Sequence, residues 1–272
     1  MVAIWIAVGV VAAVGAVAAL ALGIADKYLS VQEDPRIGLV TAALPGANCG
    51  GCGFPGCDGY ARALVAGTAA NGACAAGGAA CAEAVSKILG VAASATERRV
   101  AVVHCCGTRS NAIRVGDYNG IADCASAAAV AGGDKGCTYG CLGYGACANV
   151  CPKGAISIRD GLAKVDKRLC IGCGKCVTAC PKHIIELVPA SATIHVLCAN
   201  PDKGPNVRKV CGVGCMGCHL CEKNSGGKEA GHFTFQGFLA KVNYENPPTD
   251  ASIVAKCPAK CMSVDPHFES GH

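Results

Sequence analysis

Cys137-Thr-Tyr-Gly-Cys-Leu-Gly-Tyr-Gly-Ala-Cys-Ala-Asn-Val-Cys151-Pro152 and Cys170-Ile-Gly-Cys-Gly-Lys-Cys-Val-Thr-Ala-Cys180-Pro181 are the two stretches that say most about the structure of this chain. Each holds four cysteines and ends in Cys-Pro. The second stretch has the spacing C-x2-C-x2-C-x3-C-P, which is typical of thiolates that bind cubane iron–sulfur clusters. The first stretch has wider gaps, and its glycines allow the loop to bulge around a metal centre.

Where two such runs occur together, the last cysteine of each run binds the cluster of the other. We therefore expect two 4Fe-4S clusters, one held by Cys137, Cys141, Cys147 and Cys180 and one held by Cys151, Cys170, Cys173 and Cys176. A zinc ribbon is the alternative interpretation. Zinc needs neither the exchanged fourth ligand nor the Cys-Pro endings, so the pattern favours iron–sulfur ligation.

The composition agrees with small modules built around metal sites. The 272 residues include 23 cysteines, and only 4% of the residues are aromatic and 16% charged. An odd number of tightly grouped cysteines in a chain of this length does not suit a disulfide-stapled secreted protein. The formal charge of +5 leaves out clusters that each carry about minus two. Because the basic residues are scattered, we expect no nucleic-acid partner.

A third set of cysteines follows the N-terminal region, within Leu44-Pro-Gly-Ala-Asn-Cys-Gly-Gly-Cys-Gly-Phe-Pro-Gly-Cys57. Residues 58–66 have the pattern of a helix, and a further cysteine returns sixteen residues after the loop. A loop, a helix and a turn that present four thiolates predict another 4Fe-4S cluster, with zinc as the competing metal. Its ligands would be Cys49, Cys52, Cys57 and Cys74.

The C-terminal part of the chain carries an incomplete run. Its first three cysteines have ferredoxin spacing, but Ser225 stands where the fourth would be. Cys257, which precedes a proline, can supply the missing ligand, so we expect a fourth cluster held by Cys215, Cys218, Cys221 and Cys257. The remaining cysteines there leave a fifth cluster open: Cys198, Cys211 and Cys261.

Four cysteines between the first set and the double run match no ligand template: Cys81, Cys105, Cys106 and Cys124. Residues 82–90 have a helical pattern, and the Val-rich residues 99–105 have that of a buried strand. Cys81 and Cys105 are therefore interpreted as core residues, with ligation of an additional cluster as the alternative. The total number of clusters stays open.

The chain begins with a stretch of about two dozen uncharged residues, from Val2 to Ala25. This length suits a helix that crosses a membrane, and no basic segment precedes it as in a secretory signal. Lys27 and Arg36 follow it, so the positive-inside tendency predicts a single-pass anchor with the remaining chain in the cytoplasm.

The anchor, the Cys-Gly-Gly-Cys-Gly-Phe-Pro-Gly-Cys loop with its later cysteine, and the double run together resemble the B subunit of the Rnf ion-translocating electron-transport complex. The resemblance extends from Met1 to about Val188, and the C-terminal part is similar to extended versions of that subunit. It implies a complex in the inner (cytoplasmic) membrane that moves electrons between ferredoxin and NAD, coupled to translocation of sodium ions or protons. The implied partners are soluble ferredoxin and the other membrane and peripheral subunits. The resemblance also implies that the strands after the two Cys-Pro pairs pair with each other.

These observations predict an α+β chain of small iron–sulfur modules behind one transmembrane helix. The expected parts are an anchor over 1–27, a loop–helix 4Fe-4S domain over 28–92, a connecting segment over 93–128, a two-cluster ferredoxin-like domain over 129–190 and a ferredoxin-like segment over 191–272.

The sequence offers no nucleotide-binding motif and no catalytic acid, base or nucleophile apart from metal ligands. We therefore expect an oxidoreductase subunit whose chemistry resides in its clusters. Electrons would enter from ferredoxin at the double or the C-terminal module and leave through the cluster nearest the anchor. The alternative is a membrane-tethered electron carrier that serves a non-pumping reductase or a redox regulator.

Overall fold

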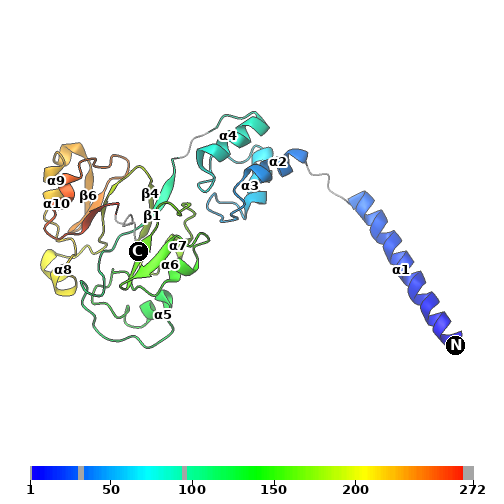
Figure 1. Ribbon diagram of the computed structural model, residues 1–272, viewed down its shortest axis with the longest axis horizontal. Coiled ribbons are helices and arrows are strands. Elements are labelled where there is room, and N and C mark those ends of the chain that lie inside the picture. Colours follow the sequence, from blue (N-terminus) through cyan, green and yellow to red (C-terminus); the bar gives the residue numbers. More distant parts are fainter. Residues whose placement is uncertain (1, 30–33, 94–96, 266–272) are drawn as a thin grey trace.

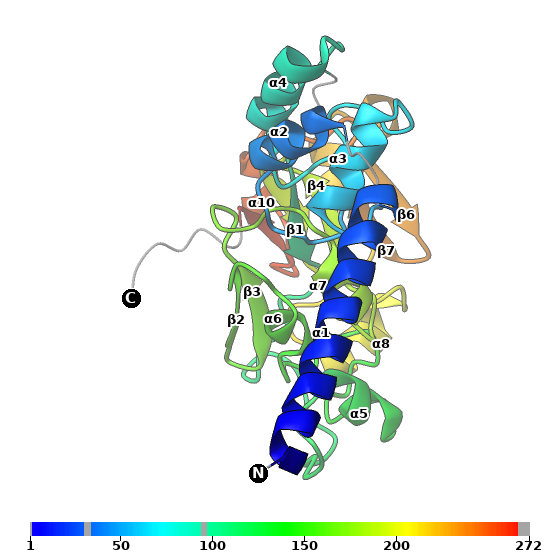
Figure 2. The same cartoon turned by 90° about the vertical axis from the view of Figure 1, so that its right-hand side faces the viewer.

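A computed structural model describes residues 2–29, 34–93 and 97–265 of the chain (Figures 1 and 2). Short helices alternate with two-stranded sheets, which confirms the predicted mixture of helix and strand. Parts of the predicted connecting segment and of the C-terminal segment, residues 94–96 and 266–272, lie outside the described residues.

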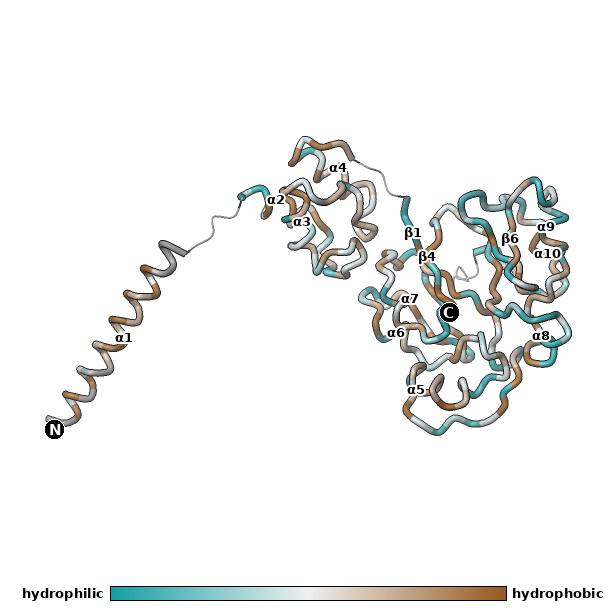
Figure 3. Tube along the Cα trace, turned by 180° about the vertical axis from the view of Figure 1, so that it is seen from behind, coloured by the Kyte–Doolittle hydropathy of each residue, from teal (hydrophilic) through white to brown (hydrophobic). Residues whose placement is uncertain are grey.

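The first element is helix α1, Val2–Leu29, which projects away from the other elements in Figure 1. Its described side chains are largely apolar and exposed, with Trp5 and Leu22 as examples. In Figure 3 the backbone tube of this helix is coloured mostly brown to white, which marks hydrophobic residues. Within the described part of the chain, no helix is both long and apolar enough to cross a membrane. Residues 2–27 of the expected anchor are thus helical, while insertion of this helix into a membrane stays a prediction.

Three helices form a separate group next along the chain (Figure 1): α2 (Pro35–Ala43), α3 (Cys57–Val65) and α4 (Gly78–Leu89). Helix α2 begins where the Asp34 side chain accepts a hydrogen bond from the Arg36 N–H and Pro35 occupies the first turn. The helices share an apolar core that includes Val40, Tyr60 and Val85. The predicted helix over 58–66 is confirmed, and that over 82–90 begins four residues earlier, at Gly78.

The next unit consists of two antiparallel strand pairs with three short helices. Strand β1 pairs with β4, and the hairpin strands β2 and β3 pair with each other. Its elements are β1 (Arg99–Val103), α5 (Cys124–Ala129), α6 (Ala146–Asn149), β2 (Ile156–Arg159), β3 (Leu162–Val165), α7 (Lys175–Ala179) and β4 (Ile185–Pro189).

The buried strand predicted over 99–105 is confirmed as β1, since Val100 to Val103 are all buried. The expectation that the strands after the two Cys-Pro pairs would pair with each other is wrong. Strand β4 pairs with β1 instead, and β2 pairs with β3. The reason is that β1, which lies in the predicted connecting segment, is itself apolar. When it pairs with β4, its Val100 and Val102 are buried together with Val188.

The C-terminal unit repeats this arrangement. Strands β5 and β8 form one antiparallel pair and β6 and β7 form a hairpin. The sequence Leu-Ala-Lys-Val recurs in β3 and in β7, where the first, second and fourth residues are buried in both copies. Its elements are β5 (Ile194–Val196), α8 (Gly204–Val210), α9 (Leu220–Asn224), the 3-10 helix η1 (Lys228–Ala230), β6 (Phe233–Gln236), β7 (Leu239–Val242), α10 (Ser252–Ala255) and β8 (Met262–Val264).

Candidate metal centres

The cysteines of the helical group gather around one cavity of ≈ 360 Å³, which is lined by Cys49, Cys52, Cys57 and Cys74. We call these four residues group A. The loop that carries the first three is held to α3 because the Asn48 side chain accepts a hydrogen bond of 2.8 Å from the Cys57 N–H. Burial raises the pKa of the Cys74 thiol, and the other three cysteines of the group raise it further. The four predicted ligands therefore face one another.

A second set, group B, consists of Cys151, Cys170, Cys173 and Cys176. Burial raises the pKa of Cys176 to about 12, and the three other members lie close enough to add to this rise. Two sulfurs accept backbone hydrogen bonds: Cys170 from the Ala101 N–H at 3.4 Å and Cys151 from the Ala155 N–H at 3.3 Å. Such N–H groups stabilise thiolate sulfur, so this predicted ligand set suits a cluster.

The other predicted set of the double run is not brought together. The cavity that holds Cys141, Cys147 and Cys180 is completed by Cys124, and Cys137 does not line it. Cys124 is the first residue of α5, where the Asp123 side chain accepts hydrogen bonds from the N–H groups of the two residues after Cys124. We call Cys124, Cys141, Cys147 and Cys180 group C.

Cys137 lies instead in a cavity of ≈ 390 Å³ between the two ferredoxin-like units. Its cysteines come from three different segments of the chain and form group D: Cys105, Cys106, Cys137, Cys198 and Cys211. Cys105 packs against the apolar core of its unit, as the core interpretation predicts, and its sulfur also accepts a hydrogen bond of 3.4 Å from the Cys141 N–H and faces other cysteines.

Hydrogen bonds divide the five sulfurs of group D into two kinds. Cys198 accepts from the Cys215 N–H at 3.3 Å, and Cys137 accepts from the Asn200 side chain at 3.6 Å. Cys211 receives a backbone hydrogen bond at Val213 that opposes the rise of its pKa by burial. The Cys106 thiol instead donates to the Val213 carbonyl at 3.5 Å, and burial raises its pKa strongly. Four sulfurs, with that of Cys105 included, thus accept hydrogen bonds as iron-bound sulfurs do, while Cys106 donates one.

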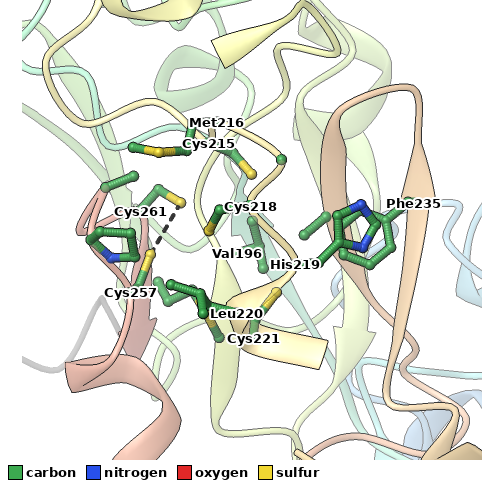
Figure 4. Close-up of a pocket in the computed structure, with 15 residues that line it drawn as sticks. Val196, Cys215, Met216, Cys218, His219, Leu220, Cys221, Phe235, Cys257 and Cys261 are labelled. Atoms are coloured by element: carbon green, nitrogen blue, oxygen red, sulfur yellow. Dashed lines mark hydrogen bonds between the residues drawn. The ribbon is translucent and has the colours of Figure 1, made fainter. Parts of the chain in front are cut away.

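The C-terminal cysteines surround a further cavity of ≈ 370 Å³ and form group E: Cys215, Cys218, Cys221, Cys257 and Cys261 (Figure 4). The predicted set of four is brought together here with Cys261 as an additional member. The sulfurs of Cys257 and Cys261 lie 3.7 Å apart. Hydrogen bonding by the Cys261 thiol lowers the pKa of Cys215 to about 6 and that of Cys257 to about 5, and raises its own pKa.

Among the described residues, no three His, Cys, Asp or Glu side chains lie close enough together to hold a single metal ion. A cubane is a wider site, because each of its four thiolates binds a different iron atom. The chemistry of the donor sets fits such clusters, since every group offers at least four cysteines and backbone N–H groups are aimed at several sulfurs. The remaining cysteine, Cys81, is buried in the apolar core of the helical group.

The five groups are neighbours in a fixed order. Cys173 of group B lines the cavity of group A, and Cys176 of group B lies near Cys147 of group C. The Cys141 N–H of group C donates to Cys105 of group D, and the Cys215 N–H of group E donates to Cys198 of group D. The order A, B, C, D, E therefore runs from the helical group to the C-terminal unit.

Group D is the site that sequence reasoning missed. Apart from Cys137, its members stand in no ligand-spaced run, and they meet only because β1 and β5 bring their following loops together. The adjacent pair Cys105-Cys106 directly after a buried strand was the available signal.

Comparisons with known proteins agree with these centres. A family model described as "Putative Fe-S cluster" matches residues 44–76, the segment of group A. A second model, described as "4Fe-4S binding domain", matches residues 163–186, which include three members of group B.

Three similar proteins cover most of the chain. The B subunit of the Na(+)-translocating ferredoxin:NAD(+) oxidoreductase complex of Acetobacterium woodii is 46% identical over 98% of this chain and 79% of its own length. The B subunit of an ion-translocating oxidoreductase complex of Methanosarcina acetivorans is 40% identical over 94% of this chain and 97% of its own. The B subunit of the proton-translocating ferredoxin:NAD(+) oxidoreductase complex of Clostridium ljungdahlii is 43% identical over 74% of this chain and 72% of its own length.

Proposed function

This chain belongs to the family of B subunits of ion-translocating oxidoreductase complexes, and from that membership we propose that it conducts electrons between soluble ferredoxin and the membrane subunits of an Rnf-type complex. It is an iron–sulfur electron-transfer subunit of an oxidoreductase, and its redox chemistry resides in clusters. The family relationship favours this function over a carrier that serves a non-pumping reductase.

One observation carries the proposal: the five cysteine groups adjoin one another without a break from group E to group A. We assign one 4Fe-4S cluster to each group. In group D the ligands would be Cys105, Cys137, Cys198 and Cys211, and in group E they would be Cys215, Cys218, Cys221 and Cys257. Bound clusters would supply one-electron oxidation and reduction, while the chain orients them and adjusts their potentials.

The two ends of this series differ in exposure. All 23 cysteines lie in the described residues. Cys218 of group E is exposed, whereas the others are buried or partly buried. We propose that electrons exchange with ferredoxin beside Cys218. Group A is the end nearest to α1 in sequence, so we propose that electrons leave there toward the membrane subunits. The uncharged stretch from Val2 to Ala25 supports an inner-membrane anchor with the clusters on the cytoplasmic side.

Replacement of one ligand in group A tests this path. We expect Cys52→Ala to abolish ferredoxin-dependent NAD reduction by the assembled complex, because the last cluster before the membrane subunits loses a thiolate. Cys81→Ala is the matched control and should retain activity, because Cys81 is buried beside Cys74 but belongs to none of the assigned ligand sets. Unchanged NAD reduction in Cys52→Ala would refute the assignment of group A as the exit.

The metal content tests the cluster assignment independently. Anaerobically purified chain should contain about 20 iron atoms and an equal amount of sulfide, about four of each per cluster. Colourless protein with stoichiometric zinc would refute iron–sulfur ligation as a whole.

A further inference from the structure

Lys135 is a buried cation at the boundary between groups C and D. It is 6% exposed and lines the cavity of group D together with Cys105, Cys137 and Cys211. Its Nζ donates hydrogen bonds to two backbone carbonyls, those of Gly107 at 2.8 Å and Gly161 at 3.0 Å. Lysine is rarely buried to this extent unless a negative charge compensates it.

No carboxylate supplies that negative charge in the described residues. The described ion pairs do not include Lys135. The adjacent carboxylate, Asp134, directs its Oδ2 toward Arg114 at 2.8 Å and toward the Tyr144 hydroxyl at 3.0 Å. An isolated buried ammonium is costly, because two neutral carbonyls replace only part of its hydration.

The negative charge available to Lys135 is that of the cysteine groups. The Lys135 side chain lines the cavity of group D together with Cys211, and its ammonium lies close enough to Cys141 of group C to interact with that sulfur as well. The side chain therefore acts on both cavities at once. Reduction of a cluster adds one negative charge, and a buried positive charge stabilises the reduced form.

We propose that Lys135 is the fixed counter-charge of the cluster at group D and raises the reduction potential of that cluster and, to a smaller extent, of the one at group C. This inference rests on the proposed function, since it requires a cluster at group D. Lys135 is a positioning residue that acts through its charge: it would make the centre between the two ferredoxin-like units easier to reduce.

A neutral and a charged substitution of Lys135 distinguish the effect of its charge from the effect of its hydrogen bonds. Lys135→Gln keeps amide donors for the two carbonyls but removes the charge, and Lys135→Arg keeps the charge. Lys153→Met is the matched control, because Lys153 lies two residues after a ligand, as Lys135 lies two residues before one, but is exposed. The readout is the set of midpoint potentials from a paramagnetic resonance titration of the reconstituted full-length chain, together with its iron and sulfide content.

We expect Lys135→Gln to lower one midpoint so that its reduced-to-oxidised ratio at a fixed potential falls about tenfold, which is about 59 mV for one electron. Lys135→Arg and Lys153→Met should leave the midpoints unchanged. Loss of about four irons in Lys135→Gln but not in Lys135→Arg would also support a charge requirement.

Two results would overturn the inference. One is an unchanged set of midpoints in Lys135→Gln with full iron content, and the other is equal loss of iron in the Gln and Arg variants, which would indicate packing. The iron content of the wild-type chain distinguishes this failure from that of the proposed function. About 16 irons instead of about 20, with no further loss of iron in Cys198→Ala, would mean that group D holds no cluster, whereas about 20 irons with unshifted midpoints would refute the role of Lys135 alone.

Discussion

The cysteines differ in the hydrogen bonds that their sulfur atoms make: some accept a hydrogen bond, and one donates it. Cys105, Cys151 and Cys198 each accept a hydrogen bond from a backbone N–H, as the sulfurs of iron–sulfur ligands do. Cys106 donates to a carbonyl, which favours the thiol. Sequence spacing treats these residues alike, because a cysteine has the same ligating atom whichever role it takes.

The exchange of Cys124 for Cys137 is testable with pairs of substitutions. If Cys124 and Cys147 bind the same cluster, Cys124→Ala combined with Cys147→Ala should lose about four irons per chain. Cys137→Ala combined with Cys147→Ala should lose about eight, since group D would be damaged too. The measurement is iron and sulfide analysis after anaerobic reconstitution, with Cys81→Ala as the control. Loss of only about four irons from Cys137→Ala combined with Cys147→Ala would restore the ligand set predicted from sequence.

His219 has a left-handed backbone conformation, which residues other than glycine rarely adopt. It has φ of +58°, while Gly174 at the corresponding position of the double run has φ of +77°. Two contacts hold the histidine in this conformation. Its ring stacks on Phe235 with centroids 3.8 Å apart, and its Nδ1 lies 3.1 Å from Glu222 Oε2. The side chain thereby covers one edge of the group E cavity (Figure 4).

Among the elements, a backbone contact joins the loop of the helical group to the loop of the double run. A Cβ atom placed on Gly51 would lie 3.1 Å from both the Cα and the carbonyl oxygen of Cys173. Backbone atoms cannot rotate away as a flexible side chain can. The close approach of groups A and B therefore depends on glycine at this position.

We expect Gly51→Val to retain iron but to slow electron transfer between groups A and B. Overpacking of this kind costs about 1–3 kcal/mol, which separation of the two loops would relieve. The measurement is the rate at which the group A cluster becomes reduced after rapid mixing with a reductant. Gly38→Val in α2 is the matched control, because nothing lies within 4 Å of its Cβ position. A rate in Gly51→Val equal to that of the control would contradict this prediction.

Across the whole molecule, the order of the groups assigns different tasks to its two ends. The exposed Cys218 is bordered by basic side chains: the Arg208 guanidinium lies 3.9 Å from the Met216 sulfur, and Lys203 Nζ lies 5.9 Å from the Phe238 ring centroid. Met216 and Phe238 both adjoin the loop that carries Cys218. Such a rim suits an electron carrier with an acidic surface.

Charge reversal at this rim should weaken the encounter with ferredoxin. We expect Lys203→Glu combined with Arg208→Glu to reduce the rate of electron uptake from reduced ferredoxin about tenfold or more at low salt. The difference from wild type should shrink as the salt concentration rises. Stopped-flow spectroscopy measures the rate, and Lys87→Glu on α4 is the control for net charge. Equal rates in the rim variant and the control would exclude this face as the docking site.

The features that depend on local spacing could be predicted from the sequence. The ligand runs of groups A, B and E, the helix α3 and the buried strand β1 follow from patterns within short segments, since a loop between close ligands has few possible geometries. Family membership was also readable, because the loop of group A and the double run lie on one chain in a recognisable order.

Which distant cysteines meet is instead a property of the folded chain. Cys124 joins group C, and Cys137 joins cysteines that follow β1 and β5, because the pairing of strands far apart in the sequence, such as Arg99 opposite Pro189, brings those loops together. The buried charge of Lys135 and the exposure of Cys218 likewise depend on how the units pack against each other. Spacing along the chain carries no information about such contacts, since their geometry is set by the sheet and core that form between segments.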